Sequence, residues 1–92
     1  MHTLLLVDDD PDVLSTLMRS FRKGYITLAA NGGEEGIALL NQHSIDLIIC
    51  DQRMPNISGD QVLRHALEIQ PDAIRILLTG YADVESLLTC VT

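Results

Sequence analysis

Two short apolar runs that end in aspartate constrain the fold of this chain most strongly. Thr3–Val7 is followed by three aspartates at positions 8–10, and Ile45–Cys50 is followed by Asp51. A continuous apolar run of this length is typical of a strand that is buried on both faces, and such strands occur mainly in parallel sheets. The aspartates indicate where each strand meets solvent.

Helical patterns separate these runs from two further β-prone segments. Asp10 and Pro11 are typical of a helix start, because aspartate caps free amides and proline fits the first helical position. The predicted elements are, in order, a strand at Thr3–Val7, a helix from Asp10 to Gly24, a strand at Tyr25–Ala29, a helix through Leu40, a strand at Ile45–Cys50, a helix from Ser58 to Pro71, a strand at Ala73–Leu78 and a helix at Asp83–Val91. The third helix is expected to bury Val62, Leu63, Ala66, Leu67 and Ile69.

Strands that alternate with helices at this spacing predict a doubly wound α/β fold, in which a parallel sheet is covered on both faces. Functional sites in such sheets lie at the carboxyl ends of the strands. Asp8, Asp9, Asp51 and Thr79 all follow predicted strands. We therefore expect these four side chains to meet at one edge of the sheet.

Composition narrows the class of protein. The 92 residues are 47% hydrophobic and carry a net charge of −7, with 13 acidic against 6 basic residues. This is typical of one globular domain, 1–92, with a surface that repels nucleic-acid phosphates and anionic membranes. No run approaches the ~18 apolar residues of a membrane span. We expect a cytoplasmic protein that does not bind nucleic acid or membrane directly.

The two cysteines, Cys50 and Cys90, lie in apolar surroundings without the spacing of a zinc site or a disulfide framework. Both are interpreted as small buried hydrophobic residues in a reducing environment.

Three carboxylates at one sheet edge favour a bound cation. Each pair repels by ~3 to 4 kcal/mol at 4 to 5 Å and an effective dielectric near 20. Magnesium fits best, since it takes oxygen ligands and leaves positions for water and phosphate. Asp51 is then the candidate nucleophile for a phosphoryl group, and Thr79 could offer a hydroxyl to a phosphate oxygen. The alternative for positions 8–10 is a helix cap, which is the role expected of Asp10.

Three motifs carry a family resemblance. Leu4–Asp10, Asp51–Pro55 with Gly59, and Leu77–Ala82 resemble, in order and spacing, the conserved strand ends of bacterial response-regulator receiver domains. The resemblance covers the whole chain. It implies a flavodoxin-like sheet with the strand order 2-1-3-4.

The resemblance also implies roles. Asp51 corresponds to the phosphorylated aspartate, Asp8 and Asp9 to the acidic pair that holds Mg²⁺, Arg53 to the position whose main-chain carbonyl completes the metal site, and Thr79 to the switch hydroxyl. A sensor histidine kinase, a phosphotransfer protein or a small donor such as acetyl phosphate would supply the phosphoryl group. The signal would pass to an output domain or partner, so a phosphoacceptor is expected and not a turnover enzyme.

One departure from the receiver pattern concerns the C-terminal part. Receivers have a fifth strand that ends in a lysine and a fifth helix, whereas this sequence stops at Thr92 and has its one lysine, Lys23, near the first helix. If nothing followed, the fourth strand would be an open edge and phosphorylation would be slow or absent. A homodimer through that edge or the fourth helix is predicted.

Two rival functions remain open. In a haloacid-dehalogenase-type phosphatase the nucleophile lies in an Asp-x-Asp after the first strand, and Asp8 and Asp10 have that spacing. The later motifs of that family are absent. The other rival is a receiver-like module that is not phosphorylated and acts only through protein contacts.

Overall fold

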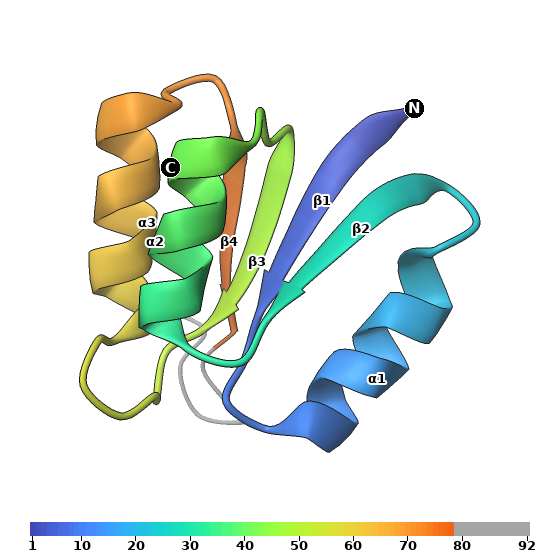
Figure 1. Ribbon diagram of the computed structural model, residues 1–92, viewed down its shortest axis with the longest axis horizontal. Helices are drawn as coiled ribbons and strands as arrows, with labels where there is room; N and C mark the ends of the chain where they lie inside the picture. The colour runs from blue at the N-terminus through green and yellow to red at the C-terminus, as the bar shows by residue number, and fades with distance from the viewer. Residues whose placement is uncertain (79–92) are drawn as a thin grey trace.

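A four-stranded parallel sheet with helices on both faces forms the part of the chain described by the computed structural model, residues 1–78 (Figure 1). The elements are β1 His2–Val7, α1 Pro11–Phe21, β2 Tyr25–Ala30, α2 Gly33–Gln42, β3 Leu47–Asp51, α3 Gly59–Ile69 and β4 Ile74–Leu78. The strand order is β2-β1-β3-β4, with every neighbouring pair parallel. The predicted doubly wound fold and strand order are confirmed.

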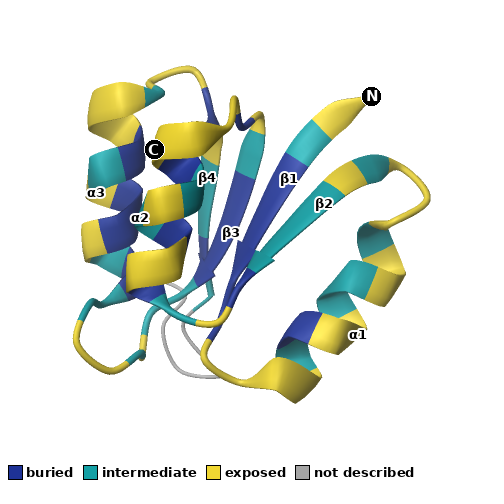
Figure 2. Ribbon diagram, in the orientation of Figure 1, coloured by how far each residue is buried: buried dark blue, intermediate teal, exposed yellow. Residues whose placement is uncertain are grey.

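Alternate residues of each strand supply two separate cores. In β1, Leu5 and Val7 belong to the larger core, whereas Leu4 and Leu6 belong to the smaller one. Figure 1 shows α2 and α3 over one face and α1 over the other, and the strands between them are largely buried (Figure 2). Burial on both faces explains why the β1 sequence is continuously apolar and does not alternate.

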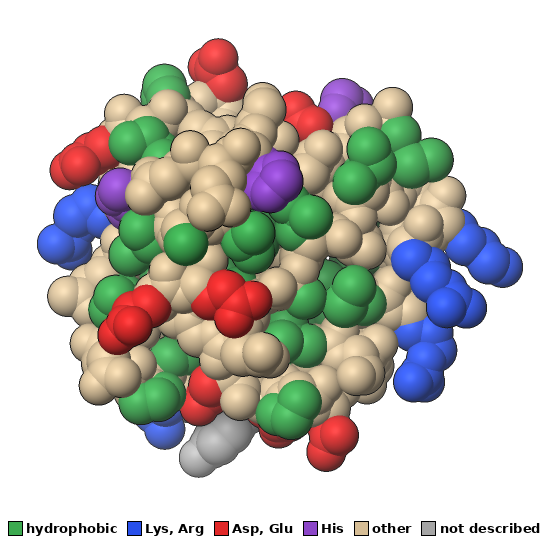
Figure 3. Space-filling view, in the orientation of Figure 1, with side chains coloured by type: hydrophobic (Ala, Val, Ile, Leu, Met, Phe, Trp, Pro, Cys, Tyr) green, Lys and Arg blue, Asp and Glu red, His purple; other side chains and the backbone are tan. Residues whose placement is uncertain are grey.

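Helix α1 begins as predicted. Asp10 occupies the N-cap and accepts a hydrogen bond from the main-chain N–H of Asp12 at 2.9 Å, and Pro11 is the first helical residue. Asp10 is therefore a helix cap. At the other end of α1, Figure 3 shows a group of basic side chains, which suits the negative end of the helix dipole.

The predicted apolar face of α3 is partly wrong. Val62, Leu63 and Ala66 are buried, but Leu67 and Ile69 are 48% and 42% exposed. A helix turns by about 100° per residue, so Val62, Leu63 and Ala66 lie within an arc of about 100° and Leu67 falls outside it. Ile69 lies in the last turn, beyond the edge of the sheet core.

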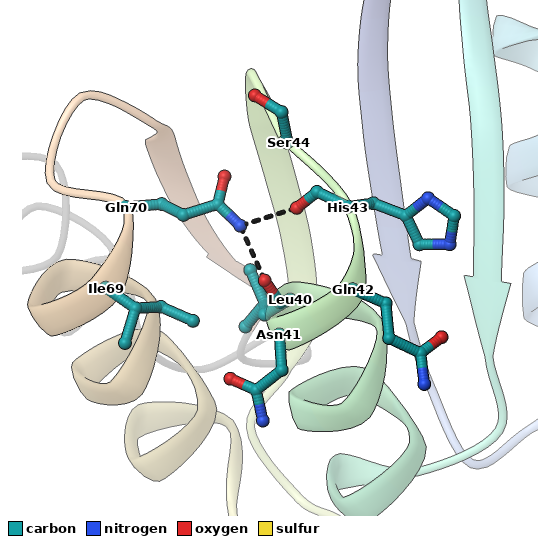
Figure 4. A pocket seen from close by; sticks show the side chains of 7 residues that line it. All are labelled: Leu40, Asn41, Gln42, His43, Ser44, Ile69 and Gln70. Atoms are coloured by element: carbon teal, nitrogen blue, oxygen red, sulfur yellow. Dashed lines mark hydrogen bonds between the residues drawn. The ribbon is translucent and has the colours of Figure 1, made fainter.

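Gln70, the C-cap of α3, connects the end of α3 to the end of α2 (Figure 4). This contact lies at the amino edge of the sheet, where β3 and β4 begin. Its side-chain amide donates to the carbonyl oxygens of Leu40 and His43, both at 2.7 Å, and accepts from the main-chain N–H of Ile45 at 2.6 Å. One side chain thus gives hydrogen-bond partners to the main-chain groups between the end of α2 and the start of β3.

Cys50 is fully buried in β3, as predicted, and burial raises the pKa of its thiol to about 12. Cys90 and the predicted helix Asp83–Val91 lie outside the described residues. Within residues 1–78, none of the helices has the length and apolar character needed to cross a membrane.

Candidate metal and phosphoacceptor site

Three aspartates from two strand ends meet at the carboxyl edge of the sheet. Asp51 is the last residue of β3, and Asp8 and Asp9 directly follow β1. Strands β1 and β3 are parallel neighbours in register from Leu4 to Val7, so their ends lie side by side. One carboxylate oxygen from each aspartate lies within 4.8 Å of the other two. The predicted convergence of these three carboxylates is confirmed.

The three carboxylates differ in exposure. Asp8 is 6% exposed, Asp51 is half-buried and Asp9 is exposed. The main chain fixes Asp8 on both sides, because its N–H donates to the carbonyl of Ala30 and its carboxylate accepts from the N–H of Asp10 at 2.9 Å. The site is therefore anchored at its base and open toward solvent.

The electrostatics of the cluster favour a cation. Burial raises the pKa of Asp8, and the charges of Asp51 and Asp9 add to the rise, although the amide of Asp10 partly offsets it. Burial, together with the charge of Asp9, also raises the pKa of Asp51. A divalent ion would relieve both the repulsion and the desolvation. The donor set, carboxylate oxygens with an open side, fits Mg²⁺.

The main chain after Asp51 affects the pKa of its carboxyl group. Burial raises this pKa, while the nearby amides of Gln52 and Arg53 and the charge of Arg53 act in the opposite direction. Arg53 is exposed and lies two residues after the strand end at Asp51. Its predicted role as a main-chain carbonyl ligand stays a prediction.

Gly59, the first residue of α3, lies against the back of the Asp51 strand end. A Cβ at this position would come within 2.2 Å of the main-chain oxygen of Asp51 and 2.7 Å of the Leu77 side chain. Only glycine allows this approach. Before it the chain turns at Asn56, whose φ of 70° is one that asparagine tolerates.

Two candidate site residues remain to be placed. Asp10 does not belong to the three-carboxylate cluster, as expected for a helix cap. Thr79 lies outside the described residues. The last described residue before it, Leu78, is the register partner of Asp51 in the β3–β4 pair.

Ser58 is the N-cap of α3, as the sequence predicts, but sequence reasoning assigned no role to Gln52 or Asp60. Gln52 accepts a hydrogen bond from the main-chain N–H of Asp60, and the Ser58 hydroxyl donates to the Asp60 carboxylate. The spacing Ser58-x-x-Gln61 is a capping-box signal that could have indicated part of this network. The Gln52 contact has no such local signal.

Comparison with known proteins assigns this chain to a family. A family model for the response regulator receiver domain matches residues 4–92. The chain belongs to the response regulator receiver family. The predicted family is confirmed, and neither rival function is favoured.

Relatives of this receiver include the transcriptional regulatory protein GlrR of Escherichia coli, which is 39% identical over 82 residues. That match covers 88% of this chain and 18% of GlrR, so the chain spans less than a fifth of that relative. Among solved structures, the response regulator TrrA of Thermotoga maritima, in complex with Mg²⁺ and BeF, is 36% identical with a TM-score of 0.86. The alignment covers 97% of this chain and 78% of TrrA.

A response regulator from Burkholderia pseudomallei, solved with a phosphorylated aspartic acid and a calcium ion, is 29% identical with a TM-score of 0.86. The alignment covers 99% of this chain and 54% of that protein. Together, these likenesses confirm the flavodoxin-like receiver fold.

Proposed function

We propose that this domain, residues 1–92, is a phosphorylation switch in which Asp51 accepts a phosphoryl group. The observation that carries the proposal is the gathering of the Asp8, Asp9 and Asp51 carboxylates at one edge of the sheet. A carboxylate oxygen of Asp51 attacks phosphorus in line with the bond to the donor. With a phosphohistidine donor, the P–N bond breaks, and the histidine nitrogen keeps the electron pair.

Asp8, Asp9, Asp51 and the main-chain carbonyl of Arg53 would hold Mg²⁺. When bound, the ion offsets the negative charge that otherwise opposes the approach of a phosphoryl group to three carboxylates. Asp8 is the anchor of this set, since it is buried and hydrogen-bonded by the Asp10 amide. The close approach of Gly59 to the Asp51 main-chain oxygen fixes the backbone that carries the attacking carboxylate.

The signal leaves the site through Thr79 in this proposal. Its hydroxyl would donate to a phosphoryl oxygen, and the movement would alter the segment after β4. The paired ends of β3 and β4 support this route, because Asp51 and Leu78 are register partners.

We infer that the donor is a sensor histidine kinase or phosphotransfer protein in the cytoplasm. The recipient of the signal is an output domain or a downstream effector, consistent with GlrR being a transcriptional regulatory protein. The net charge of −7 argues against direct nucleic-acid binding by this segment. The domain would act as a phosphoacceptor and not as a turnover enzyme.

A homodimer through β4 or the predicted fourth helix stays a prediction. Within the described residues β4 pairs only with β3, and Ile74 is 63% exposed. Sedimentation at increasing protein concentration is the measurement. A strict monomer at high concentration would contradict a dimer.

The test is incubation with acetyl phosphate and Mg²⁺, followed by intact-mass measurement. We expect a base-labile mass gain of one phosphoryl group that Asp51→Asn abolishes. Asp10→Asn is the matched control, because Asp10 lies at the same edge but outside the cluster, and it should retain the gain. The opposite pattern would support phosphatase chemistry. Failure of the parent to gain mass or to bind beryllofluoride would support a module that acts only through protein contacts.

A further inference from the structure

Gln52, the residue after Asp51, ties the end of β3 to two neighbouring elements. Its main-chain N–H donates to the carbonyl of Leu78 at 3.0 Å, and its main-chain carbonyl accepts from the N–H of Gly59 at 3.0 Å. Its side-chain oxygen accepts from the N–H of Asp60 at 2.9 Å. One half-buried residue therefore holds the reactive strand end against both β4 and the start of α3.

Asp60, which donates to the Gln52 side chain, is itself held by a second hydrogen bond. The Ser58 hydroxyl donates to a carboxylate oxygen of Asp60 at 2.5 Å. This bond lowers the pKa of Asp60, and the Gln52 side chain acts in the same direction. Asp60 is thus held at its carboxylate by Ser58 and at its main-chain N–H by Gln52, which fixes the first turn of α3 next to the end of β3.

Movement of this turn would reach the reacting carboxylate directly. Gln52 directly follows Asp51 in the main chain, and its carbonyl accepts from the N–H of Gly59. Gly59 also packs closely against the Asp51 main-chain oxygen, which a Cβ at this position would approach to 2.2 Å. Rotation of the α3 start away from Gln52 would therefore shift the main chain that carries Asp51.

We propose that Gln52 is a positioning residue, whose side-chain amide fixes the start of α3 against main chain 51–53 and so aims the Asp51 carboxylate toward Asp8 and Asp9. This inference rests on the proposed function, because it assigns Gln52 a part in the Mg²⁺-dependent phosphoryl site. The simpler role of a helix cap makes a different prediction.

The chain offers a matched control for the simpler role. Gln61 caps the same helix, since its side-chain oxygen accepts from the N–H of Ser58 at 2.9 Å, but none of its described hydrogen bonds reaches main chain 51–53. Gln52→Met and Gln61→Met each replace a glutamine by an unbranched side chain of similar length that cannot accept this bond. Both remove one acceptor from the α3 N-terminus.

The experiment measures, for the full chain and both variants, the dissociation constant of Mg²⁺ by calorimetry, the bound beryllofluoride signal by ¹⁹F NMR, and the melting temperature. We expect similar losses of melting temperature in both variants. Gln52→Met should raise the Mg²⁺ dissociation constant roughly tenfold and shift or broaden the beryllofluoride signal. Gln61→Met should stay within about twofold of the parent in Mg²⁺ binding.

Equal Mg²⁺ binding by the two variants would overturn the inference and leave Gln52 as a helix cap. If Gln52→Met does not fold, Gln52→Asn gives the same measurement, because it stays polar but is one methylene too short to reach Asp60. A parent chain that binds neither Mg²⁺ nor beryllofluoride would overturn the proposed function itself, and the inference with it.

Discussion

Asp46, just before β3, and Asp51, at its end, are held in opposite electrostatic states. Asp46 accepts from the N–H of Thr3 at 2.8 Å and lies 3.5 Å from His2, and the Thr3 bond in particular lowers its pKa. Burial and a neighbouring carboxylate raise the pKa of Asp51. At the amino edge, the negative charge of Asp46 is therefore stabilised by hydrogen bonding and by His2. At the carboxyl edge, the aspartates repel one another, and this repulsion favours the binding of a cation and a phosphoryl group.

The largest loss of stability and of Mg²⁺ binding is expected from a substitution at Gly59, which packs against the main chain of Asp51. Gly59→Ala places a Cβ against the Asp51 main chain, which cannot move without breaking β3. We expect a loss of about 3 kcal/mol or more in the free energy of unfolding, together with loss of Mg²⁺ binding. Urea unfolding measures the first and calorimetry the second. Gly24→Ala is the control, because a Cβ added at Gly24 would have no neighbouring atom within 4 Å. Equal stability of the two variants would contradict the packing argument.

The amino edge should affect stability without affecting function. Gln70→Ala removes three hydrogen bonds to the main chain and leaves those groups unpaired near the core. The expected cost is about 2 kcal/mol in the free energy of unfolding, with unchanged Mg²⁺ affinity. Gln42→Ala, at an exposed position on α2, should be close to neutral by the same urea measurement. A change in Mg²⁺ affinity in Gln70→Ala would break the separation of the two edges.

Removing one repelling carboxylate should stabilise the metal-free protein. Because the pKa of Asp51 is raised, its favourable contribution is present below the ordinary value of 3.8 and is lost as pH rises through the raised pKa. Asp51→Asn should therefore raise the metal-free stability at neutral pH by about 1 kcal/mol. Melting temperatures with chelator test this, and Asp10→Asn should show a smaller gain. A destabilised Asp51→Asn would contradict the repulsion argument.

The smallest change in the free energy of unfolding is expected for substitution of Asp46. Since its pKa is lowered, the stability it contributes is present above the ordinary value of 3.8 and is lost as pH falls through the lowered pKa. Asp46→Asn should be less stable than the parent at neutral pH, and the difference should shrink in acid. Chemical unfolding across that range measures it, and a difference that grows in acid would have the wrong sign.

Local patterns predicted the strands and the metal cluster because their signals are contiguous. Leu4–Val7 is apolar throughout since both faces are buried, and Asp51 is the last residue of its strand. Leu67 was misassigned because apolar character alone does not fix a helical face. The contacts of Gln52 and Gln70 could not be predicted, because each joins main chain distant in sequence, up to 30 residues away for Gln70. Thr79 lies outside the described residues, so its predicted role remains a prediction.

The most direct test of the contrast between the two edges is a ¹³C NMR titration of the aspartate carboxyl groups, with and without Mg²⁺. We predict that metal-free Asp8 and Asp51 titrate above 3.8 and Asp46 below it, and that Mg²⁺ lowers the pKa of Asp8 and Asp51 while leaving Asp46 unchanged. Titration of Asp8 and Asp51 at or below their ordinary value without metal, or no response to Mg²⁺, would contradict the account.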